Sequence, residues 1–201
     1  MSTTVNAPAF DRPSLDEPFL SPIDKPRGLI LKLIYRMSRR QFGKVMMPLR
    51  VFMARMPLGF GKFYGRIGQL DKKLTLNPEL VMLVRAQVAR INVCLFCIDI
   101  ARWFTIQASM KQEKFDALGD YATSSLFSAA ERAALDYVTE LTRNKKIEPE
   151  TFARLAQHYS EREICEMVWL VATEHVYNMT NIGLNIHSDL LCDMRQQRRR
   201  A

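Results

Sequence analysis

The chain has 201 residues, 48% of them hydrophobic, and a formal net charge of +8 at pH 7 from 29 basic and 21 acidic residues. This length is enough for one domain with a substantial core, and no apolar run reaches the ~18 to 20 residues of a membrane-spanning helix. Few runs alternate apolar and polar residues, which argues against an all-β fold. We expect a proline-rich irregular arm over 1–26, one all-α domain over 27–192 and a basic tail over 193–201.

The helices expected in the first half begin after the proline-rich arm. An apolar stripe with helical spacing starts at Leu29, and lysines and arginines lie away from it. Pro48 and Pro57 divide the next stretch into short helices. Asn77 is a suitable cap for a largely buried helix with Pro78 at its first position.

Two capping boxes predict where later helices begin, one formed by Ser128 and Glu131 and one by Ser160 and Glu163. No segment has a clear strand pattern, so the expected fold class is all-α. The helices expected after Asn92 span roughly 94–109, 128–143, 151–158 and 160–177.

The basic charge is concentrated in residues 25–73 and in the tail 195–200. No aromatic residues alternate with a basic run, and no helix pair has a helix-turn-helix signature, so sequence-specific nucleic-acid binding is not supported. The amphipathic helix from Leu29 to Lys44 is expected to pack on the core or on a neighbouring subunit, with peripheral contact to anionic membranes as the alternative.

Cys94-Leu95-Phe96-Cys97 is the paired-thiol motif of the chain. Two intervening residues let both sulfurs face the same way and form a disulfide or hold a metal. A cysteine in the first turn of a helix lies near the positive end of the helix dipole, which favours the reactive thiolate. The N-terminus does not have the pattern of a secretory signal, so we expect a cytoplasmic protein, in which such a pair is more often catalytic or metal-binding than a structural staple.

The remaining cysteines and histidines do not complete a zinc site. Cys165 and Cys192 are isolated, and neither forms a close ligand pair with a histidine. We expect both to be small apolar core residues, and no metal or other cofactor is predicted. The methionine-rich segment 46–56 is expected to contribute to ordinary packing, with an apolar pocket wall as the alternative.

The central region resembles the carboxymuconolactone decarboxylase and alkylhydroperoxidase-D superfamily. The resemblance covers about residues 70–187 and is carried by the segment 83–92 that leads into the cysteine pair, by 128–135, and by the long helix with Asn178 and Asn181. It implies an all-helical fold that assembles into homo-oligomers such as trimers or hexamers. In the peroxidase branch the two thiols cycle through a disulfide, and a glutamate and a histidine relay protons.

Two groups of the family's peroxidase motif are missing from this chain. Met82 stands at the glutamate position and Ala101 at the histidine position. The substitutes considered for the proton carrier are Glu79, one helical turn earlier, Asp99, and the late-helix residues Glu174 and His175, which reach the thiols if that helix packs on them. The candidate catalytic set is therefore Cys97, Cys94, His175, Glu79 and Asp99.

Three functions are compatible with these residues. The first is a thiol-disulfide oxidoreductase that reduces organic hydroperoxides, with Cys97 as the peroxidatic thiol, Cys94 as the resolving thiol and an external dithiol as reductant. The second is a decarboxylase-like enzyme acting on a small acid or lactone with His175 and nearby arginines. The third is a non-catalytic oligomeric scaffold.

Overall fold

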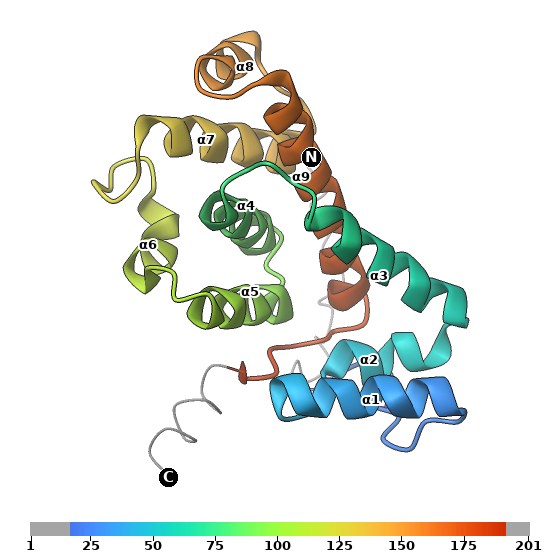
Figure 1. Ribbon diagram of the computed structural model, residues 1–201. Helices are drawn as coiled ribbons and strands as arrows, with labels where there is room; N and C mark the ends of the chain where they lie inside the picture. Colours follow the sequence, from blue (N-terminus) through green and yellow to red (C-terminus); the bar gives the residue numbers. More distant parts are fainter. Residues whose placement is uncertain (1–16, 192–201) are drawn as a thin grey trace, which may run out of the picture.

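The computed structural model describes residues 17–191, and within this range the chain is all-helical, as predicted (Figure 1). Residues 1–16 and most of the predicted basic tail, together with Cys192, lie outside the described residues. The α-helices are α1 (Leu29–Phe42), α2 (Met47–Val51), α3 (Leu58–Asp71), α4 (Pro78–Ile91), α5 (Leu95–Gln107), α6 (Gln112–Asp116), α7 (Ala129–Asn144), α8 (Pro149–Ala156) and α9 (Glu161–Ile182), with 3₁₀ turns at Met53–Arg55 and Ala117–Asp120.

The helix starts follow the capping residues that the sequence indicates. Asn77 accepts a hydrogen bond from the backbone N–H of Glu79 at 2.8 Å, with Pro78 as the first residue of α4. Both predicted capping boxes are present, at the starts of α7 and α9. These bonds satisfy N–H groups that the first helical turn leaves without an intrahelical partner.

Helix α4 forms the centre of the molecule, and α5, α7 and α9 pack around it (Figure 1). Its apolar side chains point in several directions, which is why α4 reads as a nearly continuous apolar segment. One core cluster joins α4 to α7 and α9, and a second joins α4 to α5, α6 and α7. Burial of these side chains stabilises the fold by about 25 cal/mol per Å² of apolar surface.

The segment containing α1 and α2 is fastened to the end of the chain. Asp189 is buried, accepts a hydrogen bond from the backbone N–H of Met47 at 2.8 Å and pairs with Lys44 at 3.0 Å. Tyr35 of α1 donates to the carbonyl of Ile23 at 2.7 Å. These contacts place α1 and α2 beside the region that follows α9 (Figure 1).

Two sequence predictions need correction. Cys165 is exposed on α9 and does not fill the core, because it lies on the outward face between the buried Ile164 and Glu166. The helix expected from 94 begins at Leu95, and Cys94 is its N-cap with extended backbone. None of the helices between residues 17 and 191 contains a stretch long and apolar enough to cross a membrane.

Candidate functional site

The cysteine pair lies at the tight junction between α4 and α5. The backbone N–H of Cys94 donates to the carbonyl of Ala89 at 2.9 Å, and Val93 between them has a positive φ of 57°. This turn places Cys94 before α5 and Cys97 in its first turn. The two form a disulfide with Cα atoms 5.2 Å apart.

Both sulfur atoms are buried against α9. Cys94 is 1% exposed and Cys97 is 3% exposed. The side-chain amide of Asn181 lies 3.4 Å from the sulfur of Cys97 and 4.0 Å from that of Cys94. In the reduced protein a donor at this distance, together with the N-terminus of α5, favours the thiolate form of Cys97.

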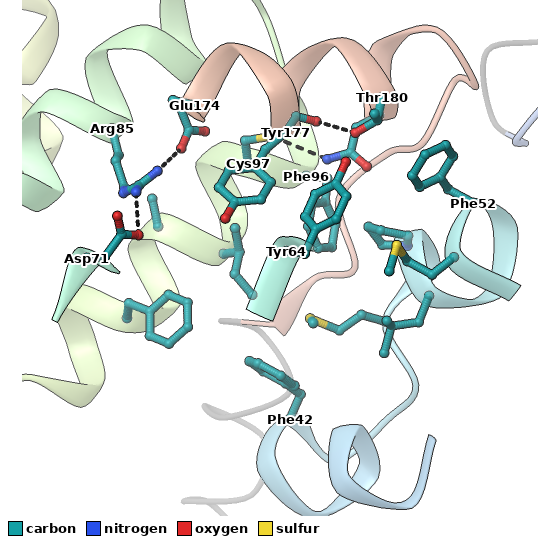
Figure 2. A pocket seen from close by; sticks show the side chains of 18 of the residues that line it. Phe42, Phe52, Tyr64, Asp71, Arg85, Phe96, Cys97, Glu174, Tyr177 and Thr180 are labelled. Carbon is teal, nitrogen blue, oxygen red and sulfur yellow. Dashed lines mark hydrogen bonds and ion pairs between the residues drawn. The ribbon is translucent and has the colours of Figure 1, made fainter. Parts of the chain in front are cut away.

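A cavity of about 520 Å³ opens beside the pair, and only one of the two cysteines lines it. Cys97 faces this cavity, whereas Cys94 is not part of its lining. The wall contains six aromatic rings and is otherwise mostly aliphatic or sulfur-containing (Figure 2). Its aromatic residues are Phe42, Phe52, Tyr64, Phe96, Phe104 and Tyr177.

The segment 42–53 supplies one wall of this cavity. Met46 and Met53 line it together with Phe42 of α1 and Leu49 of α2. The expectation that the methionine-rich segment serves ordinary packing is therefore wrong for these two methionines. The sequence did not indicate this because the wall forms only when α1 and α2 fold back toward α5.

A polar cluster of Asp71, Arg85 and Glu174 forms another part of the lining. Arg85 of α4 lies between the two carboxylates (Figure 2), 2.7 Å from Asp71 at the end of α3 and 3.0 Å from Glu174 of α9. Asp71 also accepts from the indole N–H of Trp169 at 3.0 Å. Glu174 is only 6% exposed, and burial raises the pKa of its carboxyl although the Arg85 guanidinium opposes this shift.

Behind Glu174, a chain of amides leads to His175. Asn178 donates to Glu174 at 2.7 Å, and Asn92 donates to Asn178 at 2.8 Å. The side-chain nitrogen of Asn92 also lies 3.1 Å from Nδ1 of His175. Burial and the neighbouring Lys145 both lower the pKa of His175, which favours the neutral imidazole.

The other candidate proton carriers do not line the cavity. Glu79 pairs with Lys114 at 2.7 Å, and Asp99 accepts from the Ser188 hydroxyl at 2.9 Å and from the backbone N–H of Leu191 at 3.1 Å. His175 lies behind the lining and contacts it only through Asn92 and its neighbours. The structure therefore brings none of these three side chains to the thiols.

The motif positions themselves do face the cavity. Met82 and Ala101, which occupy the places of the family's glutamate and histidine, are both lining residues. The lining also includes Tyr177, whose pKa burial raises to about 12, with the Arg85 guanidinium opposing, so that its phenol stays protonated. No cluster of His, Cys, Asp and Glu between residues 17 and 191 has the arrangement of a metal site.

Sequence comparison gives relatives without an assigned activity. No family model matches the chain. The Escherichia coli K12 protein YnjA, itself uncharacterized, is 29% identical over 176 residues, which cover 85% of this chain and 94% of that protein. The uncharacterized Bacillus subtilis protein YdfG is 23% identical over 115 residues, which cover 56% of this chain and 78% of YdfG.

Structural comparison identifies the fold. The debrominase Bmp8 bound to 2,3,4-tribromopyrrole superimposes with a TM-score of 0.72 at 18% identity, covering 89% of this chain and 96% of Bmp8. A peroxidase-related protein from Silicibacter sp. TM1040 gives 0.71 at 16% identity, over 87% and 91% of the two chains. The alkylhydroperoxidase AhpD core protein from Ralstonia eutropha JMP134 gives 0.64 at 19% identity, over 80% and 86%. The chain therefore has the all-helical fold of AhpD-like, peroxidase-related proteins.

Proposed function

We propose that this chain is a two-thiol reductase that acts on small apolar hydroperoxides. The observation that carries the proposal is the asymmetry of the cysteine pair, in which Cys97 faces a largely apolar cavity and Cys94 is bonded to it but lies outside the lining. A thiol that meets substrate and a second thiol that is shielded from it are the two parts of a resolving-cysteine mechanism.

The proposed cycle has three steps. The Cys97 thiolate attacks the terminal oxygen of the hydroperoxide, the O–O bond breaks, and the alkoxide takes a proton and leaves as an alcohol. The resulting Cys97 sulfenic acid is attacked by the Cys94 thiol, which releases water and closes the disulfide. An external dithiol then reduces the disulfide and is itself oxidised.

A free-thiol count tests this cycle. We would use a background in which Cys165 and Cys192 are serine, so that only the pair contributes, and add one equivalent of cumene hydroperoxide to reduced protein. Both thiols should disappear rapidly in this background. With Cys97→Ser the remaining thiol should persist, and with Cys94→Ser one thiol should be lost and the sulfenic acid should be trapped by dimedone.

Reductive dehalogenation is a second candidate. It is favoured by the six-ring aromatic lining and by the superposition with a debrominase that holds a bromopyrrole. The balanced reaction would convert a bromoarene and two thiols into the arene, hydrogen bromide and the disulfide. Bromide release from 2,3,4-tribromopyrrole, measured beside the thiol count, separates it from peroxide reduction.

A decarboxylase-like reaction on a small acid fits this cavity less well. Two carboxylates share one guanidinium in the lining, so an anionic substrate would meet net negative charge. If the thiols are stable toward both cumene hydroperoxide and tribromopyrrole, the redox proposal is wrong, and the scaffold interpretation gains support.

A further inference from the structure

The cluster of Asp71, Arg85 and Glu174 holds more negative than positive charge. Arg85 is the cation that pairs with each carboxylate among the described residues, and the same guanidinium serves both. When both acids are ionised, the cluster carries a net charge of −1 beside a largely apolar cavity. An incompletely compensated charge in such surroundings is costly, so a bound positive charge or strong hydrogen-bond donor stabilises it.

The carboxylates retain capacity to accept such a donor. In the structure, Oε1 of Glu174 accepts from Asn178 and Oε2 from Arg85, one bond each. Oδ1 of Asp71 accepts from Trp169 and Oδ2 from Arg85. Since each carboxylate oxygen has two lone pairs, both groups keep acceptor positions after these bonds.

The distance between this cluster and the disulfide suits a ligand that spans the cavity. Glu174 lies seven residues before Asn181 on α9, and Asn181 contacts the sulfur of Cys97. Seven residues of helix correspond to about 10 Å. The cavity of about 520 Å³ between them falls within the usual range for small-molecule sites and is bordered by Tyr64 and Tyr177, whose ring centres are 5.4 Å apart.

We propose that Glu174 and Asp71 bind the positively charged nitrogen of a small aromatic amine, placing the far end of the ligand against Cys97. This inference rests on the proposed function only for what happens at Cys97, and the binding part stands separately. It names a substrate class for the cavity, an apolar aromatic molecule with a nitrogen donor. The aromatic rings of the lining suit such a ligand because they contact both its ring and its cation.

The charged and titratable groups around Glu174 set the pH dependence of this binding. They are Arg85 on α4, Asp71 on α3, Tyr177 on α9 and, beyond Asn178 and Asn92, His175, while Lys72 lines a neighbouring hollow of about 370 Å³ that Asp71 also borders. Burial raises the pKa of Glu174, so this acid gains a proton at higher pH than an exposed glutamate. Amine affinity is expected to fall as the pH is lowered from about 8 to about 5, where the amine itself stays protonated.

Binding to the oxidised protein tests the inference without any turnover. The probes are 2-phenylethylamine, 2-phenylethanol and 3-phenylpropionate, compared by isothermal titration calorimetry. The amine is expected to bind tightest and the carboxylate weakest. In Glu174→Gln the affinity for the amine should fall by about 10- to 100-fold, as for loss of a charge-assisted hydrogen bond, while the affinity for the alcohol stays within about threefold.

Two further variants keep this test decisive. Asp71→Asn removes one negative charge from the other side of Arg85 and should weaken amine binding even if Glu174→Gln does not fold. Glu161→Gln exchanges an exposed acid on the same helix and should bind all three probes like the parent. Equal affinity for amine and carboxylate, or an unchanged amine affinity in both cluster variants, would overturn the inference. Failure of the thiol assay alone would leave it standing.

Discussion

Ala101 marks the site where this chain departs most directly from the peroxidase motif. It lies four residues after Cys97 on α5, is 6% exposed and lines the cavity. Side chains four residues apart share one face of a helix. A histidine placed here would therefore lie beside the Cys97 sulfur, and would favour the thiolate and donate a proton to the departing oxygen.

Ala101→His is expected to accelerate hydroperoxide reduction by at least about 10-fold, toward the ~100- to 10,000-fold typical of general acid–base catalysis. The measurement is the rate of thiol loss with cumene hydroperoxide under single-turnover conditions. Gln107→His adds the same side chain at an exposed position of α5 and serves as the control. A rate in Ala101→His no higher than in this control would show that a proton donor does not limit the reaction.

Val93 is a second residue with a cost that the structure exposes. Its φ of 57° is strained for a β-branched side chain, and 69% of the residue is exposed, so little apolar burial compensates. Asparagine tolerates this backbone region much better. Val93→Asn should raise the free energy of unfolding by up to about 1 kcal/mol, measured by urea denaturation of the reduced protein.

The control for this prediction is Val168→Asn, the same exchange at an exposed position inside α9. Asparagine forms helix no better than valine, so no stabilisation is expected there. A stabilising effect of equal size at both positions would mean that the backbone of Val93 is not its source.

At the scale of elements, sequence predicted helix starts well and the tertiary composition of the site poorly. The capping boxes at Ser128 and Ser160 specify their own helices through bonds three residues apart, so local sequence is enough to find them. Glu174 instead acquires its partners from α3 and α4, which are distant in the chain. Its spacing of four residues to Asn178 and seven to Asn181 was the available signal, since all three share a face of α9.

The wall formed by α1 and α2 depends on a single buried acid. Asp189 receives the backbone N–H of Met47 and the ammonium of Lys44, and its side chain is 1% exposed. Asp189→Ala leaves both partners without it, and we expect a loss of about 2 to 4 kcal/mol in unfolding free energy. Hydrogen exchange should show α2 amides opening more readily than those of α4.

An exposed ion pair supplies the comparison for this change. Asp116 and Arg102 are 2.7 Å apart, with side chains about half exposed. Asp116→Ala should cost less than about 1 kcal/mol, because solvent screens such pairs. If Asp189→Ala is as mild as this exchange, the buried contacts do not fasten the wall.

At the scale of the whole molecule, α1 presents an apolar stripe that the described chain does not cover. Leu29, Ile30, Leu33 and Met37 are between 56% and 83% exposed, and helical spacing places them on one face. An apolar surface of this kind is typical of a contact between proteins or with a lipid surface. The arginines and lysines of the same helix make both partners physically reasonable.

We expect this stripe to join copies of the chain into a homo-oligomer. Light scattering after size exclusion should give a mass above one chain, and Leu33→Glu with Met37→Glu should lower it by placing charge in the contact. Because apolar burial drives the association, it should persist at high salt. Binding to anionic vesicles that disappears at high salt, with the protein monomeric throughout, would assign the stripe to a membrane surface instead.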